Sequence, residues 1–447
     1  MPRAIPRPRS RRPAQPAAIE RGRNLLRDTP GATTQRRWAA GPALEWLAVA
    51  AAAALLAWQL ATPDPRIGDD DFQVFYRGAA AIAVGRSPYV GDFVSPPWFA
   101  LALVPVTWLP LAAARAIWLA LNVALLLLTT VACARFVGRR WPPPDEDAPA
   151  RRERATAHRV GLQWPPRRLL LAALLLGLWP PVEFGLKLGQ NSLLVYSLVL
   201  AALLAARARR FGRAGAILAL ALVKPQLVVL FAAGLAVLAA RQRALPRYLA
   251  AAIAVVVALA LAVLLVAPDA YADLLARRPR TWNYWGSTVA LPPLLATLTG
   301  SQPLALTAYV PAAAAGSLAL LRAWAREKPR ALAYLAALTA CATLLLTPYA
   351  YPYDAVLLQL PALWLVVRTS TCWRLGWRPW LALAAALCAT WLLERPGDYT
   401  AWRFLGLLPP LGLLSTLVAT RRALSYSGAA TAHRRPQRRG ARQCGNR

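Results

Sequence analysis

The chain has 447 residues, of which 58% are hydrophobic, and its formal net charge is +33. Apolar stretches of about 20 residues recur from Leu44 to Thr420, and a helix of that length crosses a hydrocarbon core of ~30 Å. These features exclude a soluble globular protein and predict an all-α, polytopic helical membrane protein with about 12 transmembrane helices.

In chain order, the predicted spans lie near residues 43–62, 112–134, 169–182, 192–206, 214–223, 225–240, 248–267, 303–321, 331–347, 353–367, 379–393 and 404–420. With the N-terminus inside, 41 of the 52 Lys and Arg residues lie in predicted inner segments. The positive-inside rule therefore predicts this orientation in the plasma membrane, with both termini cytoplasmic. The basic excess is then a topology signal that also suits anionic membrane lipids, and no nucleic-acid partner is expected.

The two ends of the chain, residues 1–42 and 424–447, are basic and poor in apolar residues, which is typical of disordered segments. We expect them to be cytoplasmic tails that flank a multi-span domain over residues 43–423. Within this domain, residues 213–240 fit either one long helix or two short helices that meet at Lys224-Pro225. Basic runs at both ends of this segment favour a hairpin with both ends inside.

The longest predicted outer loop covers residues 63–111. It contains an amphipathic stretch, Phe72–Val84, followed by a turn that begins at Gly85. The apolar stretch Trp98–Leu109 is too short to cross a membrane comfortably, so we expect an interfacial helix there.

Three consecutive acids, Asp69, Asp70 and Asp71, open the amphipathic stretch of this outer loop. Carboxylates beside hydrocarbon are costly unless they serve chemistry or find a partner. One interpretation is a general base that accepts the proton of a hydroxyl group, with Asp71 as that base. The alternative is helix capping, because acids are favourable at a helix N-terminus.

Lysine is rare in this chain, with three lysines against 49 arginines, and Lys187 and Lys224 both fall at predicted outer tips of spans. An ammonium at this depth is a natural partner for a lipid-linked phosphate, although snorkelling to the interface is the alternative. In the same region, Gln190 and Asn191 are candidates to bind sugar hydroxyls or to cap the following helix.

A second large outer segment, residues 268–302, carries Arg277 and Arg278 close to Trp282. These side chains are candidates to hold a phosphate and stack on a sugar ring, or to form an interfacial belt. Tyr349, Tyr351, Tyr353 and Asp354 form a further outer tip, for which an aromatic belt is the simpler interpretation.

Several common kinds of site are not indicated. No glycine-rich phosphate cradle, Cys/His metal spacing or nucleophile elbow is present in the sequence. Both histidines, His158 and His433, fall in predicted inner segments. No cofactor and no divalent metal are therefore expected.

Taken in order, these motifs resemble glycosyltransferase family 87 over roughly residues 65–350. The motifs are Asp71-Phe72-Gln73-Val74-Phe75-Tyr76, Gly85-Arg86-Ser87-Pro88-Tyr89, Pro96-Pro97, the stretch 105–122, Gly189-Gln190-Asn191, Gly215 and Lys224-Pro225. The resemblance implies the GT-C fold and an enzyme similar to mycobacterial polyprenol-phosphate-mannose-dependent α-mannosyltransferases. In such enzymes an aspartate in the first outer loop is the catalytic base, a role that the resemblance carries onto Asp71.

The combined hypothesis is an inverting hexosyltransferase of the membrane, and a mannosyltransferase in the first instance. It would move a sugar from a polyprenyl-phosphate donor to a lipid or glycan acceptor on the outer face. Asp71 would be the base, and the expected substrate-binding residues are Asp70, Tyr76, Tyr89, Gln190, Asn191, Lys224, Arg277 and Arg278. The alternative is a transporter or flippase for a lipid-linked glycan, although transporters tend to place ionisable groups near the midplane of the membrane.

Overall fold

A computed structural model describes residues 42–62, 70–89, 92–138, 165–276, 288–371 and 407–433 of the chain. Every regular element within these ranges is a helix, which confirms the predicted all-α class. The contacts divide the chain into two units, residues 1–48 and residues 49–447. Of the first unit, the described residues form only the beginning of helix α1 (Pro42–Ala61).

Five described helices are long and apolar enough to cross a membrane. They are Ala43–Ala61 of α1, α4 (Leu111–Gly138), α11 (Leu245–Val266), α14 (Gln302–Arg326) and the segment Pro329–Leu346, which comprises a 3-10 turn η6 (Pro329–Ala331) and α15 (Leu332–Leu346). The helices α6 (Pro166–Gly177) and α7 (Pro180–Lys187) would make a sixth span if this bent pair counts as one. The chain is thus a helical membrane protein, and the expected twelve spans stay a prediction.

The structure differs from the predicted span at 169–182, because this segment is not one straight helix. Helix α6 ends at Gly177, and α7 starts at Pro180 after a bend of 75°. Pro180 and Pro181 stand in the first turn of α7, where the missing backbone N–H costs nothing. The same prolines cannot continue a preceding helix, which explains the break.

Other predicted spans are shorter or less regular than a full crossing requires. The structure has α8 (Ser192–Arg207), α9 (Phe211–Leu220) with the 3-10 turn η4 (Ala221–Val223), and α10 (Pro225–Arg241). Before α16 (Gln359–Thr371) lies the 3-10 helix η7 (Pro352–Leu358). The helix α19 (Leu408–His433) overlaps the last predicted span, whereas 379–393 lies outside the described residues.

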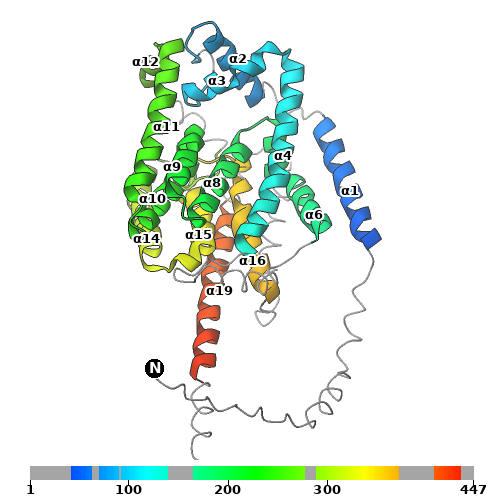
Figure 1. The fold of residues 1–447 in the computed structure, drawn as a ribbon, viewed down its shortest axis with the longest axis vertical. Coiled ribbons are helices and arrows are strands. Elements are labelled where there is room, and N and C mark those ends of the chain that lie inside the picture. The colour runs from blue at the N-terminus through cyan, green and yellow to red at the C-terminus, as the bar shows by residue number, and fades with distance from the viewer. Residues whose placement is uncertain are drawn as a thin grey trace, which may run out of the picture. The chain divides into compact units, whose positions relative to one another are not determined.

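Helices are present where the sequence predicts them within residues 63–111. The amphipathic stretch forms α2 (Asp71–Ala83), whose buried side chains include Phe72, Phe75 and Ile82. Next come α3 (Pro97–Leu103) and the 3-10 helix η3 (Val104–Trp108). Figure 1 shows α2 and α3 together at one end of residues 49–447, where α2 contacts α4 and α3 contacts α11.

Helices α9 and α11 cross at unusually close range, and a glycine permits it. A Cβ added to Gly215 of α9 would stand 2.2 Å from the carbonyl oxygen of Tyr248 in α11. A Cβ at Gly212, one turn earlier, would find nothing nearer than 3.6 Å. Only the short turn η4 separates α9 from Lys224. The close crossing of α9 and α11 therefore helps to position Lys224 at the break between α9 and α10.

This pair of glycines yields a matched test of the packing. Gly215→Ala is expected to lower the thermal unfolding midpoint in detergent by several degrees, because α9 and α11 must separate. Gly212→Ala is expected to leave the midpoint unchanged or raise it, since Ala is favoured over Gly in a helix by roughly 0.5–1 kcal/mol. Equal midpoints for the two variants would contradict the close crossing.

Candidate active site

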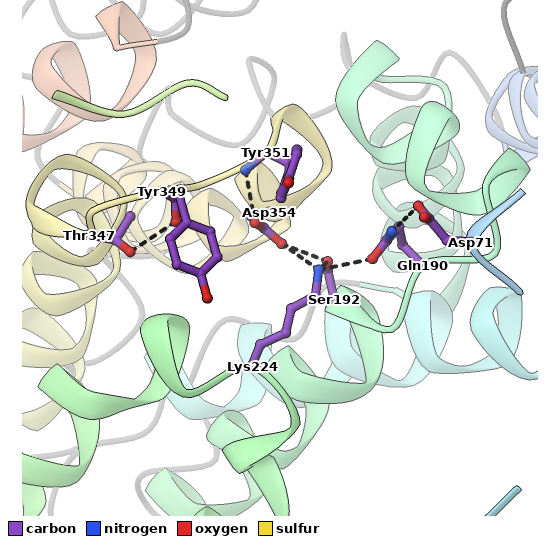
Figure 2. Close-up of polar contacts among 8 residues, drawn as sticks. All are labelled: Asp71, Gln190, Ser192, Lys224, Thr347, Tyr349, Tyr351 and Asp354. Atoms are coloured by element: carbon purple, nitrogen blue, oxygen red, sulfur yellow. Dashed lines mark hydrogen bonds and ion pairs between the residues drawn. The ribbon is translucent and has the colours of Figure 1, made fainter. Parts of the chain in front are cut away.

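Four helix beginnings converge around one lysine. Helix α2 begins at Asp71, α8 begins at Ser192, and Lys224 is the residue directly before α10. The fourth is η7, whose first turn contains Asp354. We refer to Asp71, Gln190, Ser192, Lys224 and Asp354 as the polar cluster, which Figure 2 shows joined by hydrogen bonds and an ion pair.

The structure separates the roles of two neighbouring acids. Asp70 is the N-cap of α2, where its carboxylate accepts a hydrogen bond from the backbone N–H of Gln73 at 2.7 Å. Its second oxygen lies 2.8 Å from the guanidinium of Arg115. Helix capping, which the sequence left open for all three acids, thus falls to Asp70. Asp69 lies outside the described residues.

Asp71 points toward the loop before α8 instead. Its Oδ2 accepts a hydrogen bond from the amide Nε2 of Gln190 (Figure 2). Burial raises the pKa of the Asp71 carboxyl above its ordinary value, while the Gln190 hydrogen bond and the Lys224 charge oppose that rise. Asp71 belongs to α2, which is not one of the helices long and apolar enough to cross a membrane. The result is a carboxylate better suited to accept a proton than an exposed aspartate.

Gln190 connects this carboxylate to the lysine. Its Oε1 accepts a hydrogen bond from Lys224 Nζ at 3.0 Å, while its Nε2 donates to Asp71. An ammonium can only donate and an ionised carboxylate can only accept, so only this orientation of the amide satisfies both neighbours. The charges on either side therefore determine how the amide is turned.

Lys224 has its ionic partner on the other side of the cluster. Its Nζ lies 3.0 Å from Oδ1 of Asp354 and donates to Ser192 Oγ at 2.7 Å. The same Asp354 oxygen accepts a hydrogen bond from Ser192 Oγ at 2.7 Å. The lysine side chain is 11% exposed and the Asp354 side chain is fully buried. Lys224 Nζ also lies 4.5 Å from the centroid of the Tyr353 ring.

A glycine holds the loop of Gln190 close to α2. Gly189 has a φ of 68°, which L side chains rarely adopt, and a Cβ there would stand 2.6 Å from Cβ of Phe72. The backbone N–H of Phe72 donates to the carbonyl of Leu188 at 3.1 Å, and Trp118 Nε1 donates to the carbonyl of Gly189 at 2.7 Å. These contacts bring the amide of Gln190 within reach of Asp71.

A small pocket borders the polar cluster. Its lining consists of Val182, Gly185, Gln190, Ser192, Leu193, Tyr353 and Val356. Among the described residues, no group of three or more His, Cys, Asp and Glu side chains could hold a metal ion.

Other predicted site residues make contacts away from the polar cluster. The Tyr76 hydroxyl donates to the carbonyl of Leu109 at 2.9 Å, and the Tyr89 hydroxyl donates to that of Ser95 at 3.1 Å. Both hydroxyls thus make contacts within the segment 63–111. Their substrate-binding role stays a prediction, as does that of Asp70. Arg277 and Arg278 lie outside the described residues.

Asn191 is fully buried at the N-cap position of α8, but its side chain makes no capping hydrogen bond. Among the described residues, neither polar atom of its amide has a hydrogen-bond partner. A buried amide without partners costs stability. Capping therefore does not explain Asn191, and its predicted role in binding substrate stays a prediction.

Lys187, the other candidate lysine, forms an ion pair with Glu183 at 2.8 Å.

Two members of the polar cluster, Ser192 and Asp354, were not among the predicted site residues. The signal for Asp354 is an acid directly before the apolar stretch 355–367. Its three neighbouring tyrosines favoured an aromatic belt instead. Only the fold brings η7 against α7 and α8, and with them Asp354 to Lys224.

A comparison with models of protein families agrees with the resemblance seen in the sequence. The family model of glycosyltransferase family 87 matches residues 93–348, which is more than half of the chain. Comparisons with curated proteins and with solved structures gave no match.

Proposed function

Because the chain belongs to glycosyltransferase family 87 and is a membrane glycosyltransferase, we propose that it transfers a hexose from a polyprenyl-phosphate donor to a hydroxyl of a lipid or glycan acceptor. Mannose is the sugar that we propose first. The observation that carries the proposal is the link from Asp71 through Gln190 to Lys224. It places a proton acceptor and a cation on opposite sides of one amide.

In this proposal Asp71 is the general base. As the acceptor hydroxyl attacks the anomeric carbon, its proton passes to the carboxylate of Asp71. The bond between the anomeric carbon and the phosphate oxygen breaks, and polyprenyl phosphate departs with the electron pair. Attack opposite the leaving group inverts the anomeric centre, so a β-linked donor yields an α-linked product.

Lys224 stabilises the charge that develops on the departing phosphate. Its ammonium is mostly buried, and a charge–charge interaction is stronger there than in water. Lys224 and Ser192 stand at the N-terminal ends of α10 and α8. Helix N-termini carry partial positive charge, so both helices favour an anion at this position. A phosphate is a good leaving group, and we propose that the reaction uses no cofactor and no divalent metal.

The proposed reaction takes place on the outer face of the plasma membrane, with both termini in the cytoplasm. The distribution of Lys and Arg residues supports this orientation. Membrane lipids surround the apolar helices, and the donor reaches the site from the lipid by its polyprenyl chain. A transporter of lipid-linked glycans is the competing function, and it would leave no covalent product.

The first test is transfer activity with purified protein. The wild type is expected to move mannose from polyprenyl-phosphate mannose to an acceptor in a membrane lipid extract, with radiolabelled product as the readout. Asp71→Asn is expected to lower kcat by roughly 100-fold or more, because general-base catalysis contributes about 10²–10⁴-fold. Asp273→Asn, at an exposed acid of helix α12 (Ala270–Ala276), is the matched control and should retain wild-type activity.

Full activity of Asp71→Asn would remove the base assignment. Counterflow of a lipid-linked glycan in proteoliposomes, without any covalent product, would favour the transporter instead.

A second test uses the pH dependence of kcat. Only unprotonated Asp71 is active as a base, so activity falls as the pH drops through its raised pKa. The pH at which kcat falls on the acid side of the profile, its acid limb, is expected to lie above the ordinary pKa range of aspartate. Gln190→Leu removes a hydrogen bond that lowers this pKa, so the limb should move to higher pH. Gln226→Leu is the control, because the Gln226 side-chain oxygen is buried without a hydrogen-bond partner among the described residues.

If the acid limb of kcat lies at the same pH in Gln190→Leu as in the wild type, Asp71 is not the group whose titration controls the activity.

A third test concerns the side of the membrane. Arg86→Cys and Arg210→Cys place single thiols at two exposed arginines in a background without native cysteines. A membrane-impermeant maleimide applied to intact cells is expected to label the first and not the second. The reverse pattern would place the polar cluster in the cytosol and would rule out the outer-face reaction.

A further inference from the structure

Asp354 is a buried carboxylate that the proposed reaction does not use directly. It is fully buried, and three donors satisfy it. Lys224 Nζ and Ser192 Oγ contact one oxygen at 3.0 and 2.7 Å, and the backbone N–H of Tyr351 donates to the other at 3.0 Å (Figure 2). A charge at such a position is costly to bury, so these donors must compensate for the lost hydration.

We infer that Asp354 is a positioning residue, which holds the Lys224 ammonium against Gln190 and thereby keeps the Gln190 amide donating to Asp71. This inference rests on the proposed function and extends it to a residue that need not touch either substrate. Asp354 affects Asp71 indirectly, because it holds Lys224 and Lys224 in turn orients the Gln190 amide.

The geometry supports this sequence of effects. Asp354 and Ser192 hold the ammonium on one side, and Gln190 Oε1 receives it on the other. With its oxygen engaged by Lys224, the Gln190 amide presents Nε2 to Asp71. If Lys224 moved away, the Asp71 carboxylate alone would orient the amide, and the hydrogen bond from Gln190 to Asp71 would be held less firmly.

The aromatic side chains around the lysine restrict its movement further. Lys224 Nζ lies 4.5 Å from the centroid of the Tyr353 ring, and Tyr351 stacks on Tyr353 with a centroid distance of 5.2 Å. Cation–π attraction strengthens when the cation is desolvated, as it is here. The tyrosine stack and Asp354 both belong to the segment 351–354, so one turn of the chain supplies both constraints on the ammonium.

Asp354 also acts on Asp71 through its charge. The negative charges of Asp354 and Asp70 raise the pKa of Asp71, and the positive charge of Lys224 lowers it. The charge of Asp70 is itself paired with Arg115. Among the described residues, the hydroxyl of Tyr353 is a further ionisable group that interacts with Asp71. Removing the Asp354 charge alone would lower the pKa of Asp71, but the release of Lys224 and of the Gln190 hydrogen bond has the larger and opposite effect, so the pKa of Asp71 should rise in Asp354→Asn.

The experiment measures kcat and the donor KM against pH for the wild type and Asp354→Asn. We expect a fall in kcat of about 100-fold, the size expected for a misplacement of about 1 Å in a reacting group. The donor KM should change less than threefold, and the acid limb of kcat should move to higher pH, because Asp71 loses the Gln190 hydrogen bond and the nearby Lys224 charge. Glu183→Gln is the matched control, because Glu183 is a buried acid that is paired with a different lysine, Lys187.

The named results separate a positioning role from a purely structural one. A fall in kcat with an unmoved acid limb, or with the same fall in Glu183→Gln, would overturn the inference, as would wild-type kinetics in Asp354→Asn. If Asp354→Asn does not fold, Ser192→Ala decides, because it removes one contact of Asp354 without changing the charge. The inference then requires a fall in kcat of about tenfold with the acid limb moved to higher pH, and an unchanged kcat or an unmoved limb would overturn it. Absence of transfer by the wild type would instead overturn the proposed function itself.

Discussion

The site depends on one buried ammonium, which pairs directly with Asp354 and connects to Asp71 through the Gln190 amide. Desolvation of Lys224 is costly, and the attraction of a single partner offsets that cost only when further hydrogen bonds complete the geometry. Asp354, Ser192 and Gln190 supply them at 2.7–3.0 Å. Together with Lys224 they come from three separate helix beginnings, so the cluster forms only when α8, α10 and η7 are packed together. The packing of these helices therefore determines whether the polar cluster can form.

Much of the site could be predicted from the sequence because ionisable residues are rare in an apolar chain. Lys224 is one of three lysines, and Asp71 stands at the start of an amphipathic stretch, so both attracted attention for physical reasons. Asp354 did not, because its tyrosine neighbours suit a membrane interface equally well. Its role follows from a contact with Lys224 across 130 positions of sequence, and no local pattern encodes a contact of that range.

The helical class and the helix break at Lys224 were also predictable from the sequence, because hydrophobic length and proline placement are local signals. The extent of each helix was less so. The predicted span at 169–182 overlooked Pro180 and Pro181, which start a new helix after a bend of 75°. Several predicted spans have fewer residues than a straight crossing needs, and hydrophobicity alone does not distinguish a short crossing from a re-entrant segment.

Two adjacent acids acquire different roles because a helix begins between them. Asp70 is still extended, with a ψ of 155°, and its carboxylate turns back onto the N–H of Gln73. Asp71 is the first helical residue, so its side chain leaves in another direction and meets Gln190. The cap stabilises the start of α2, and that start determines where the proposed base stands. The helix cap and the proposed catalytic base thus occupy consecutive positions. The capping residue holds the geometry, and its neighbour remains available to the amide that leads to Lys224.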